Sequence, residues 1–174
     1  MLRLYLVGMP GSGKTKIGRS LSKRIDLPFA DLDDYLVSKE GRDINTIFSE
    51  SGESYFRELE RDCLRALTKQ STSFVLATGG GAPCFFDNME YMNGHGITLF
   101  LNPPIWQIAT RMMHRSGNQK RPLLKDLEDK VLLSELEEKL KIRLPYYLQS
   151  AFEVDLGLDF FEQRVQRIIE LVEF

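Results

Sequence analysis

The chain has few of the residues that bind structural metals. Its 174 residues include only two cysteines, Cys63 and Cys84, and two histidines, His95 and His114. The cysteines lie far apart without metal-ligand spacing, and the histidines are too few and too separated for a structural zinc site. We therefore expect no structural zinc site, and we expect both cysteines to be buried small side chains in a reducing compartment.

An excess of positive charge is also absent. The chain has 23 Lys and Arg against 25 Asp and Glu, a net charge of −2, whereas proteins that bind nucleic acid or anionic membranes usually present a basic face. No stretch approaches the length of a transmembrane helix, and a glycine-rich turn interrupts the first apolar run after Val7, which argues against a signal peptide. These absences favour one cytoplasmic domain over 1–174, with neither nucleic acid nor a membrane as partner.

One stretch near the start carries a specific signal. The apolar run 4–7 leads into the sequence GMPGSGKT at positions 8–15, and helical spacing follows, which is the order of a phosphate-binding P-loop. Its glycines let backbone N–H groups converge on phosphate, Lys14 brings positive charge to the β- and γ-phosphates, and the Thr15 hydroxyl is placed to ligate magnesium. A chance glycine-rich turn is the alternative. The nucleotide-binding residues that we expect here are Pro10, Gly11, Ser12, Gly13, Lys14 and Thr15.

Short apolar runs alternate with helical patterns along the chain, which is typical of parallel α/β proteins. We expect strands at 4–7, 27–30, 74–77, 97–101 and 152–155. We expect helices at about 14–25, 33–39, 44–50, 52–69, 87–92, 103–113, 127–149 and 160–172, with a kink near Pro145. This order predicts an α/β fold of the P-loop NTPase type, a three-layer, doubly wound domain around a five-stranded parallel sheet. Ligands then bind outside the carboxyl ends of the strands.

Two carboxylates, Asp31 and Asp33, follow the second expected strand. A parallel sheet places them on the same edge as the P-loop, so that one can hold magnesium while the other accepts or orients the proton of a substrate hydroxyl. The alternative is a helix N-cap, which is a common use of aspartate. We assign that capping role to the neighbouring Asp34.

Three other features point to an anionic substrate. Consecutive glycines after the third strand leave bare N–H groups and allow close approach, although a tight turn is the alternative. Arg57 and Arg143 can each clamp a carboxylate with paired hydrogen bonds. A surface ion pair with Glu53 explains Arg57 equally simply, and a solvated helix face explains Arg143. The basic segment 114–125 predicts a mobile lid over the phosphates, with a solvated charge run as the alternative. These glycines and arginines are Gly79, Gly80, Gly81, Arg57 and Arg143.

The motifs GMPGSGKT, DLD, YFRELE, ATGGGA, RPLL and IRLPYY follow one another in this order over nearly the whole chain. Together they resemble the shikimate kinases, in the nucleoside-monophosphate-kinase-like branch of P-loop kinases. The resemblance implies that Thr15 and Asp31 serve magnesium and that Asp33 contacts the hydroxyl that is phosphorylated. It implies that Arg57 and Arg143 bind the shikimate carboxylate beside the three glycines. The helical region that binds shikimate would span about 32–62. Apolar walls would come from Phe48, Phe56, Pro122 and Leu123.

The resemblance also assigns residues to the nucleotide. Arg121 would be the lid arginine that reaches the phosphates and the transition state. Seven residues before it, where family members often carry an arginine that stacks on adenine, this chain has His114, with Arg115 beside it and Arg111 farther back. The family's Asn- and Pro-containing turn after the last strand is replaced by the segment 155–159.

The resemblance implies an ATP-dependent enzyme that phosphorylates the 3-hydroxyl of shikimate, on the route to chorismate and aromatic amino acids. Its catalytic residues would be Asp33, Lys14 and Arg121, its cofactor Mg²⁺, and its state a monomer that binds ATP or ADP and shikimate. A gluconate or nucleoside monophosphate kinase is one alternative, which the DLD, triple-glycine and RPLL motifs disfavour. A catalytically silent nucleotide-binding module is the other, which the retained catalytic residues disfavour.

Overall fold

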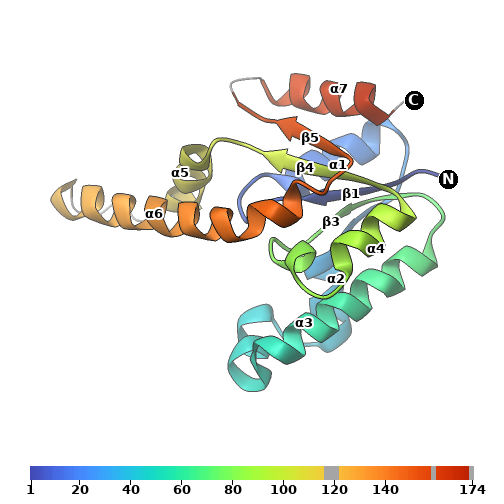
Figure 1. Ribbon diagram of the computed structural model, residues 1–174, viewed down its shortest axis with the longest axis horizontal. Coiled ribbons are helices and arrows are strands. Elements are labelled where there is room, and N and C mark those ends of the chain that lie inside the picture. The colour runs from blue at the N-terminus through green and yellow to red at the C-terminus, as the bar shows by residue number, and fades with distance from the viewer. Residues whose placement is uncertain (116–121, 158–159, 173–174) are drawn as a thin grey trace.

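A parallel sheet forms the centre of the molecule (Figure 1). The computed structural model describes residues 1–115, 122–157 and 160–172. Within these residues five strands pair in the order β2-β3-β1-β4-β5, and every pair is parallel. The strands are β1 (Arg3–Val7), β2 (Phe29–Asp31), β3 (Phe74–Ala77), β4 (Ile97–Asn102) and β5 (Phe152–Asp155).

Helices connect the strands on both faces of the sheet, as parallel pairing requires. Those between β1 and β3 are α1 (Lys14–Arg24), α2 (Leu32–Glu40) and α3 (Ile44–Gln70). Those that follow are the short 3₁₀ helix η1 (Ala82–Cys84), α4 (Asn88–His95), α5 (Ile105–Arg115), α6 (Pro122–Tyr147) and α7 (Phe161–Val172).

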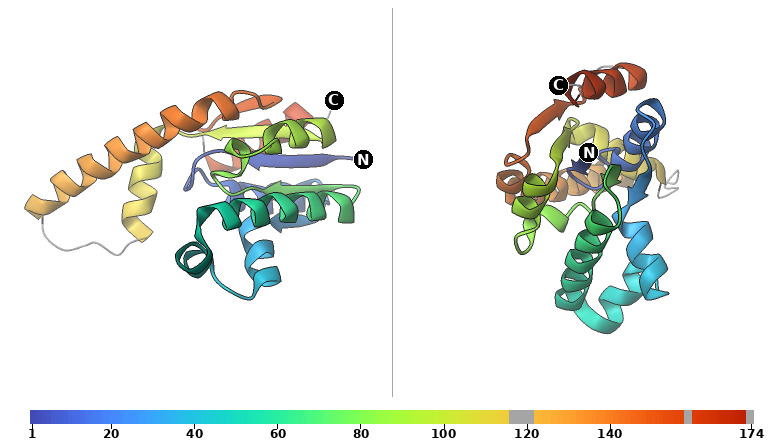
Figure 2. Two further views of the ribbon diagram at one scale, coloured as in Figure 1. Left: turned by 60° about the horizontal axis from the view of Figure 1, so that its bottom comes forward. Right: turned by 90° about the vertical axis from the view of Figure 1, so that its right-hand side faces the viewer.

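Strand β1 lies in the middle of the sheet and is buried on both faces. Leu4 and Leu6 pack into one apolar cluster with α1 and α7, while Tyr5 and Val7 pack into a second cluster with α3, α4 and α6. This division follows from the period of two in a strand, which sends successive side chains to opposite faces. The two clusters make the outer layers of a three-layer domain, with α1 and α7 on one face and α4 and α6 on the other (Figure 2).

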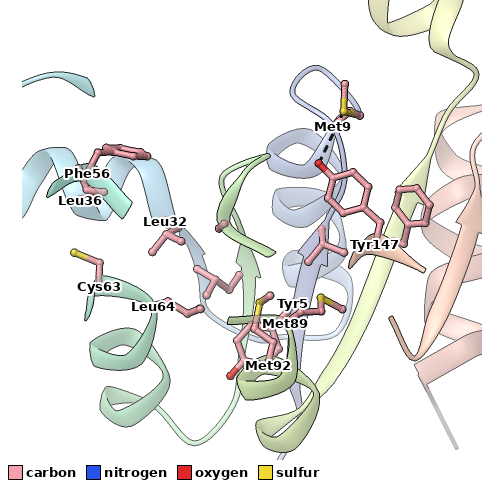
Figure 3. Packing of buried hydrophobic residues seen from close by; sticks show 14 of the residues in the cluster. Tyr5, Met9, Leu32, Leu36, Phe56, Cys63, Leu64, Met89, Met92 and Tyr147 are labelled. Atoms are coloured by element: carbon pink, nitrogen blue, oxygen red, sulfur yellow. Dashed lines mark hydrogen bonds between the residues drawn. The ribbon is translucent and has the colours of Figure 1, made fainter. Parts of the chain in front are cut away.

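The second cluster reaches the end of β1, where the glycine-rich loop begins. Tyr147, at the end of α6, stacks on Phe100 of β4 with ring centroids 5.0 Å apart. Its hydroxyl points to the sulfur of Met9, 3.9 Å away, inside the loop (Figure 3). Packing on this face therefore holds the C-terminal end of α6 next to the loop.

The predicted architecture is confirmed: an α/β fold with all five strands in the expected places. The two predicted helices at 44–50 and 52–69 are also present as halves of α3, which Gly52 interrupts with φ 80° and ψ 172°. Helix α6 begins at Pro122, inside the segment predicted as a lid, because proline is well suited to the first turn of a helix. Helix η1 was not predicted, and Cys84 within it is half-buried rather than buried.

Metal-binding clusters and membrane-spanning helices are both absent from the described residues. No group of three or more His, Cys, Asp or Glu side chains in those ranges is arranged to hold a metal ion. None of the helices described combines the length and apolar character needed to cross a bilayer.

Candidate active site

The loop between β1 and α1 forms a cradle of backbone N–H groups. Gly8, Gly11 and Gly13 have φ of 140°, 79° and 101°, which side-chain-bearing residues rarely adopt. A Cβ on Gly8 would also lie 2.6 Å from the carbonyl oxygen of Leu101. Gly13 begins α1 without a side-chain cap, so no side chain competes for the N–H groups at the positive end of the helix. This geometry suits an anion such as phosphate.

Lys14 is folded back onto this loop. Its ammonium donates hydrogen bonds to the carbonyl oxygens of Gly8 and Met9, at 2.8 and 2.9 Å, and the residue is 8% exposed. Burial lowers the pKa of Lys14 to about 8, although the nearby carboxylates of Asp33 and Asp31 act in the opposite direction. The ammonium can therefore exchange backbone carbonyls for phosphate oxygens without leaving the loop.

Asp31 connects the loop to the second strand. The Thr15 hydroxyl donates to Asp31 Oδ2 at 2.8 Å, and Asp31 Oδ1 accepts from the backbone N–H of Asp33 at 3.1 Å. Asp31 is thus the N-cap of α2, and our assignment of the cap to Asp34 is wrong. Asp34 instead lies in the first helical turn, faces solvent and pairs with Arg19 at 3.6 Å.

Asp33 lies between the glycine-rich loop and the triple glycine. Burial and the neighbouring Asp31 raise the pKa of its carboxyl, while Lys14 and Arg57 oppose the shift. A Cβ on Gly79 would lie 3.0 Å from Asp33 Oδ1, which shows how closely the carboxylate approaches that backbone. Its surroundings therefore favour a carboxylate that accepts a proton more readily than an ordinary aspartate.

The triple glycine is explained by close contacts and not by a left-handed turn. Gly79, Gly80 and Gly81 are absent from the glycines with positive φ. A Cβ on each would clash with, respectively, Glu60 Oε1 at 2.4 Å, the Pro10 ring at 2.6 Å and the Arg57 terminal nitrogens at 2.8 Å. These glycines let one loop touch the cradle on one side and buried charged groups on the other.

Arg57 forms the ion pair with Glu53 that we considered for it, but its guanidinium is buried and does not lie on the surface. It is 9% exposed, and its Nε and Nη2 both donate to Glu53 Oε1 at 3.2 Å. Its Nη1 donates to Glu60 Oε2 at 2.8 Å. Arg57 thus brings a buried positive charge to the backbone of Gly81.

Glu60 is 1% exposed, and its Oε1 has no hydrogen-bond partner within the described ranges. Burial raises the pKa of Glu60 to about 7, with Asp33 adding to the rise and Arg57 and Arg143 opposing it. Sequence reasoning gave Glu60 no role. A glutamate at helical spacing from Arg57 looks like half of an ordinary surface pair, and only its burial sets it apart.

Arg143, on α6, is a second, partly buried cation on this side. Its Nη1 is buried and has no hydrogen-bond partner in the part of the chain described, so the solvated helix face considered for it is wrong. It lies near Tyr147, whose hydroxyl donates to the carbonyl oxygen of Gly80 at 2.5 Å. Burial raises the pKa of Tyr147, which keeps that hydroxyl a donor. An unpaired guanidinium nitrogen beside the triple glycine suits an incoming carboxylate.

A cavity of about 670 Å³ opens over the cradle. Its lining joins the glycine-rich loop to Asp31, Asp33 and Gly80. Arg57, Arg143, Gly79 and Gly81 do not line it. Gly79 and Arg57 are neighbours of Asp33, Gly81 is in contact with Arg57, and Arg143 lies near Glu60 and Tyr147. The predicted residues therefore form two adjoining regions that share Asp33 and Gly80: a nucleotide side and an acceptor side.

Comparison with known proteins identifies the family of the chain. The family model of shikimate kinase matches residues 10–173. The chain belongs to the shikimate kinase family. A shikimate kinase of Bacteroides thetaiotaomicron is 40% identical over 177 residues, covering 99% of both chains. The family assignment replaces the two alternatives, a gluconate or nucleoside monophosphate kinase and a silent module.

Solved shikimate kinases have the same fold. The crystal structure from Bacteroides thetaiotaomicron matches with a TM-score of 0.86 and 38% identity, over 99% of each chain. The structure of the Acinetobacter baumannii shikimate kinase, which is in complex with shikimate, matches with a TM-score of 0.83 and 34% identity. That match covers 99% of this chain and 93% of the other.

The side chains of two residues that we predicted to contact the nucleotide are not among the described parts of the chain. Arg121 lies outside the described residues, and so does the side chain of Arg115 at the end of α5. The outer end of the cavity is instead lined by Arg111, Met112, His114, Phe161 and Arg164. Of these, Phe161 and Arg164 were not predicted from the sequence. They lie on α7 among residues that pack into the core, and no motif marks them.

Arg111 has a role that spacing did not reveal. Its Nη1 donates to the carbonyl oxygens of Gly11 and Ser12, at 3.0 and 3.2 Å, and its Nη2 donates to Gln107 at 3.0 Å. Arg111 therefore attaches α5 to the glycine-rich loop.

Proposed function

We propose that this chain transfers the γ-phosphoryl group of ATP to the 3-hydroxyl of shikimate, giving ADP and shikimate 3-phosphate on the route to chorismate. The observation that carries this proposal is the position of Asp33. This half-buried carboxylate lies between an anion cradle that contains Lys14 and a loop flanked by the buried Arg57 and the partly buried Arg143. Membership of the shikimate kinase family supports the same donor and acceptor.

The donor binds in the cradle. Backbone N–H groups of residues 11–15, at the start of α1, hold the phosphates, and Lys14 exchanges its loop carbonyls for phosphate oxygens. Negative charge builds up on the transferring group, so a buried ammonium placed before the reaction stabilises the transition state. We propose that Arg121, outside the described residues, adds a second positive charge there.

The acceptor hydroxyl binds at Asp33. A raised pKa makes this carboxylate a proton acceptor suited to a sugar-like hydroxyl, which must lose its proton as the new P–O bond forms. Orientation is the second effect, because a hydrogen bond from the hydroxyl to Asp33 aims the oxygen at the γ-phosphorus.

The shikimate carboxylate pairs with Arg57 and Arg143 beside Gly79, Gly80 and Gly81. Arg143 Nη1 supplies an unused buried donor, and Arg57 has N–H groups left beyond those bonded to Glu53 and Glu60. Phe48 and Phe56, whose ring centroids are 4.5 Å apart, provide an apolar wall near Arg57. Recognition of a ring that carries both a carboxylate and hydroxyls follows from this combination.

A magnesium ion fits the donor set between the two regions. The Thr15 hydroxyl and the Asp31 carboxylate are in hydrogen-bond contact at 2.8 Å, and both offer the oxygen atoms that Mg²⁺ prefers. When bound, the ion neutralises phosphate charge. Asp31 does not depend on it for its place, because it also caps α2.

Location and assembly are further proposals. We propose that the chain is a monomer in the cytoplasm. Two free cysteines support a reducing compartment, and a net charge of −2 argues against nucleic acid or an anionic membrane as a partner. Size-exclusion chromatography with light scattering checks the monomer directly, since a dimer doubles the measured mass.

An ADP-release assay tests the activity. Coupled ADP detection with shikimate, gluconate and nucleoside monophosphates in parallel, each with ATP and Mg²⁺, should show turnover with shikimate alone. Turnover with gluconate or a nucleoside monophosphate in its place contradicts the acceptor assignment. No turnover with any acceptor contradicts the kinase activity itself.

A further inference from the structure

Two neighbouring phenylalanines after the triple glycine pack on two arginines of α3. The centre of the Arg57 guanidinium lies 4.1 Å from the centroid of the Phe85 ring, and that of Arg61 lies 4.9 Å from the Phe86 ring. Arg57 and Arg61 are four residues apart and therefore lie on the same face of the helix. The loop thus contacts α3 through two cation–π pairs, one at the acceptor side and one nearer the surface.

The backbone at Phe86 makes this arrangement possible. Phe86 has φ of 52°, in the left-handed region that residues other than glycine rarely occupy, and its side chain is 55% exposed. The reversal of the chain at this point sends Phe85 and Phe86 to different arginines. A strained conformation persists where surrounding contacts determine it, and here the contacts are those of the two rings.

Arg57 is held at its edges by carboxylates and on its face by rings. Glu53 and Glu60 accept three hydrogen bonds from its five N–H groups, which leaves one on each terminal nitrogen. Both terminal nitrogens lie against Gly81. Among the three rings near the guanidinium, Phe85 is nearer than Phe56 at 5.0 Å and Phe48 at 5.9 Å.

We infer that Phe85 is a positioning residue for the acidic acceptor: its ring covers the guanidinium of Arg57 and keeps the two remaining N–H groups directed at the substrate carboxylate beside Gly81. The hydrogen bonds to Glu53 and Glu60 fix the position of the Arg57 guanidinium within its own plane. They do not prevent that plane from rotating about the line between the two carboxylates. A ring stacked at 4.1 Å opposes that tilt. The inference rests on the proposed function, because it requires Arg57 to bind the carboxylate of shikimate.

The first test replaces the ring and keeps the volume apolar. Phe85→Leu should raise KM for shikimate about fivefold to tenfold, in line with a partly desolvated cation–π contact, while KM for ATP and kcat change less than about twofold. Phe85→Tyr retains a ring and should remain within about twofold of the original in all three constants. Phe86→Leu is the matched control, since its partner Arg61 has no assigned role, and should leave all three unchanged. Thermal unfolding of each variant establishes that it is folded.

A double-mutant cycle then shows whether Phe85 acts through Arg57. Arg57→Lys removes the fork-shaped guanidinium and should itself raise KM for shikimate. In that background Phe85→Leu should have almost no further effect, since the group that it positions is gone. Equal effects of Phe85→Leu in both backgrounds, or a parallel rise in KM for ATP, overturn the inference. So does an unchanged KM for shikimate in Phe85→Leu alone when Arg57→Lys does raise it. The proposed function fails separately, if the unaltered chain releases no ADP with shikimate.

Discussion

At the scale of single residues, the site depends on charged groups whose burial changes their chemistry. Asp33, Glu60 and Lys14 each have a pKa displaced toward neutrality, and in each case burial is the largest cause. Burial disfavours the charged form of any group, so it raises the pKa of a carboxyl and lowers that of an ammonium. Lys14, with a pKa of about 8, and Glu60, with a pKa of about 7, can therefore exchange a proton near neutral pH. Asp33 accepts a proton more readily than an ordinary aspartate does.

Replacement of Asp33 by asparagine tests the central assignment. Asp33→Asn keeps the shape but removes the proton acceptor, so we expect kcat to fall by about 10²-fold to 10⁴-fold while ATP still binds. The fall in kcat is measured by ADP release and ATP affinity by calorimetry. Asp34→Asn is the control, because Asp34 is 74% exposed and pairs only weakly with Arg19; its kcat should stay within about twofold. Near-normal turnover by Asp33→Asn would falsify the role.

Glu60 should make stability depend on pH in a defined direction. Its pKa is raised from 4.5 to about 7, and burial is the main cause. Since folding favours the protonated form, the contribution of Glu60 is fully present below pH 4.5 and is lost as the pH rises through about 7. Glu60→Gln has no proton to lose, so its stability relative to the original chain should rise between these pH values by up to about 3 kcal/mol.

Urea unfolding of both chains at pH 5 and pH 7.5 measures this difference. The comparison between chains cancels the titration of groups that they share. The ion pair with Arg57 exists only when Glu60 is ionised, and its effect is already contained in the pKa of about 7, so the change in the difference between pH 5 and pH 7.5 carries the information. A difference in the free energy of unfolding that is equal at both pH values shows that Glu60 does not titrate in this range.

At the scale of elements, the loop from β3 to η1 sets the spacing between the two regions. Gly79 approaches Glu60 and Asp33, Gly80 approaches Pro10 of the cradle, and Gly81 approaches Arg57. A side chain at any of these positions would separate groups that must stay within contact distance.

Gly79→Ala should be more harmful than its size suggests. The new Cβ would lie 2.4 Å from the buried Oε1 of Glu60, which cannot move into solvent, so we expect a loss of stability of about 1–3 kcal/mol and at least a tenfold fall in kcat/KM for shikimate. Gly94→Ala is the matched control. Gly94 lies in α4 with nothing within 4 Å, so alanine there should stabilise the fold by about 0.5–1 kcal/mol without altering activity. A Gly79→Ala variant with unchanged kinetics would show that these contacts relax freely.

The sequence was sufficient to predict most helices and strands, but not which of their charged side chains are buried. The apolar run 74–77, which comes shortly before the triple glycine, predicted β3 to the residue, and the segment 152–155 predicted β5. Burial of Arg57 and Glu60 could not be predicted, because an arginine and a glutamate three residues apart on a helix are usually a solvated pair. Which aspartate caps α2 was also undetermined, since Asp31, Asp33 and Asp34 are all suitable types.

For the whole molecule, strand order explains why distant motifs meet. In the order β2-β3-β1-β4-β5, the strand before the glycine-rich loop lies beside the strand before the triple glycine, and that strand lies beside the one that ends at Asp31. Because the pairs are parallel, their carboxyl ends share one edge. The meeting of these three motifs was therefore predictable from the motifs and a parallel sheet. The position of α6, which adds Arg143 and Tyr147, depends on tertiary packing that no local pattern encodes.

The division into a nucleotide side and an acceptor side predicts separable effects of ligands on stability. A ligand at about 100 times its Kd stabilises the folded state by about 2.7 kcal/mol, which raises Tm by several degrees in a domain of this size.

Lys14→Met should abolish most of the Tm increase caused by ATP with Mg²⁺ but keep the increase caused by shikimate, because Lys14 contacts the cradle and not the acceptor loop. Arg143→Met should show the opposite pattern, since its unpaired Nη1 lies on the acceptor side. Thermal unfolding of each variant with each ligand, compared with the same variant alone, measures all four responses. Loss of both responses in either variant would mean that the two sides form one cooperative pocket and that the division drawn from the geometry is wrong.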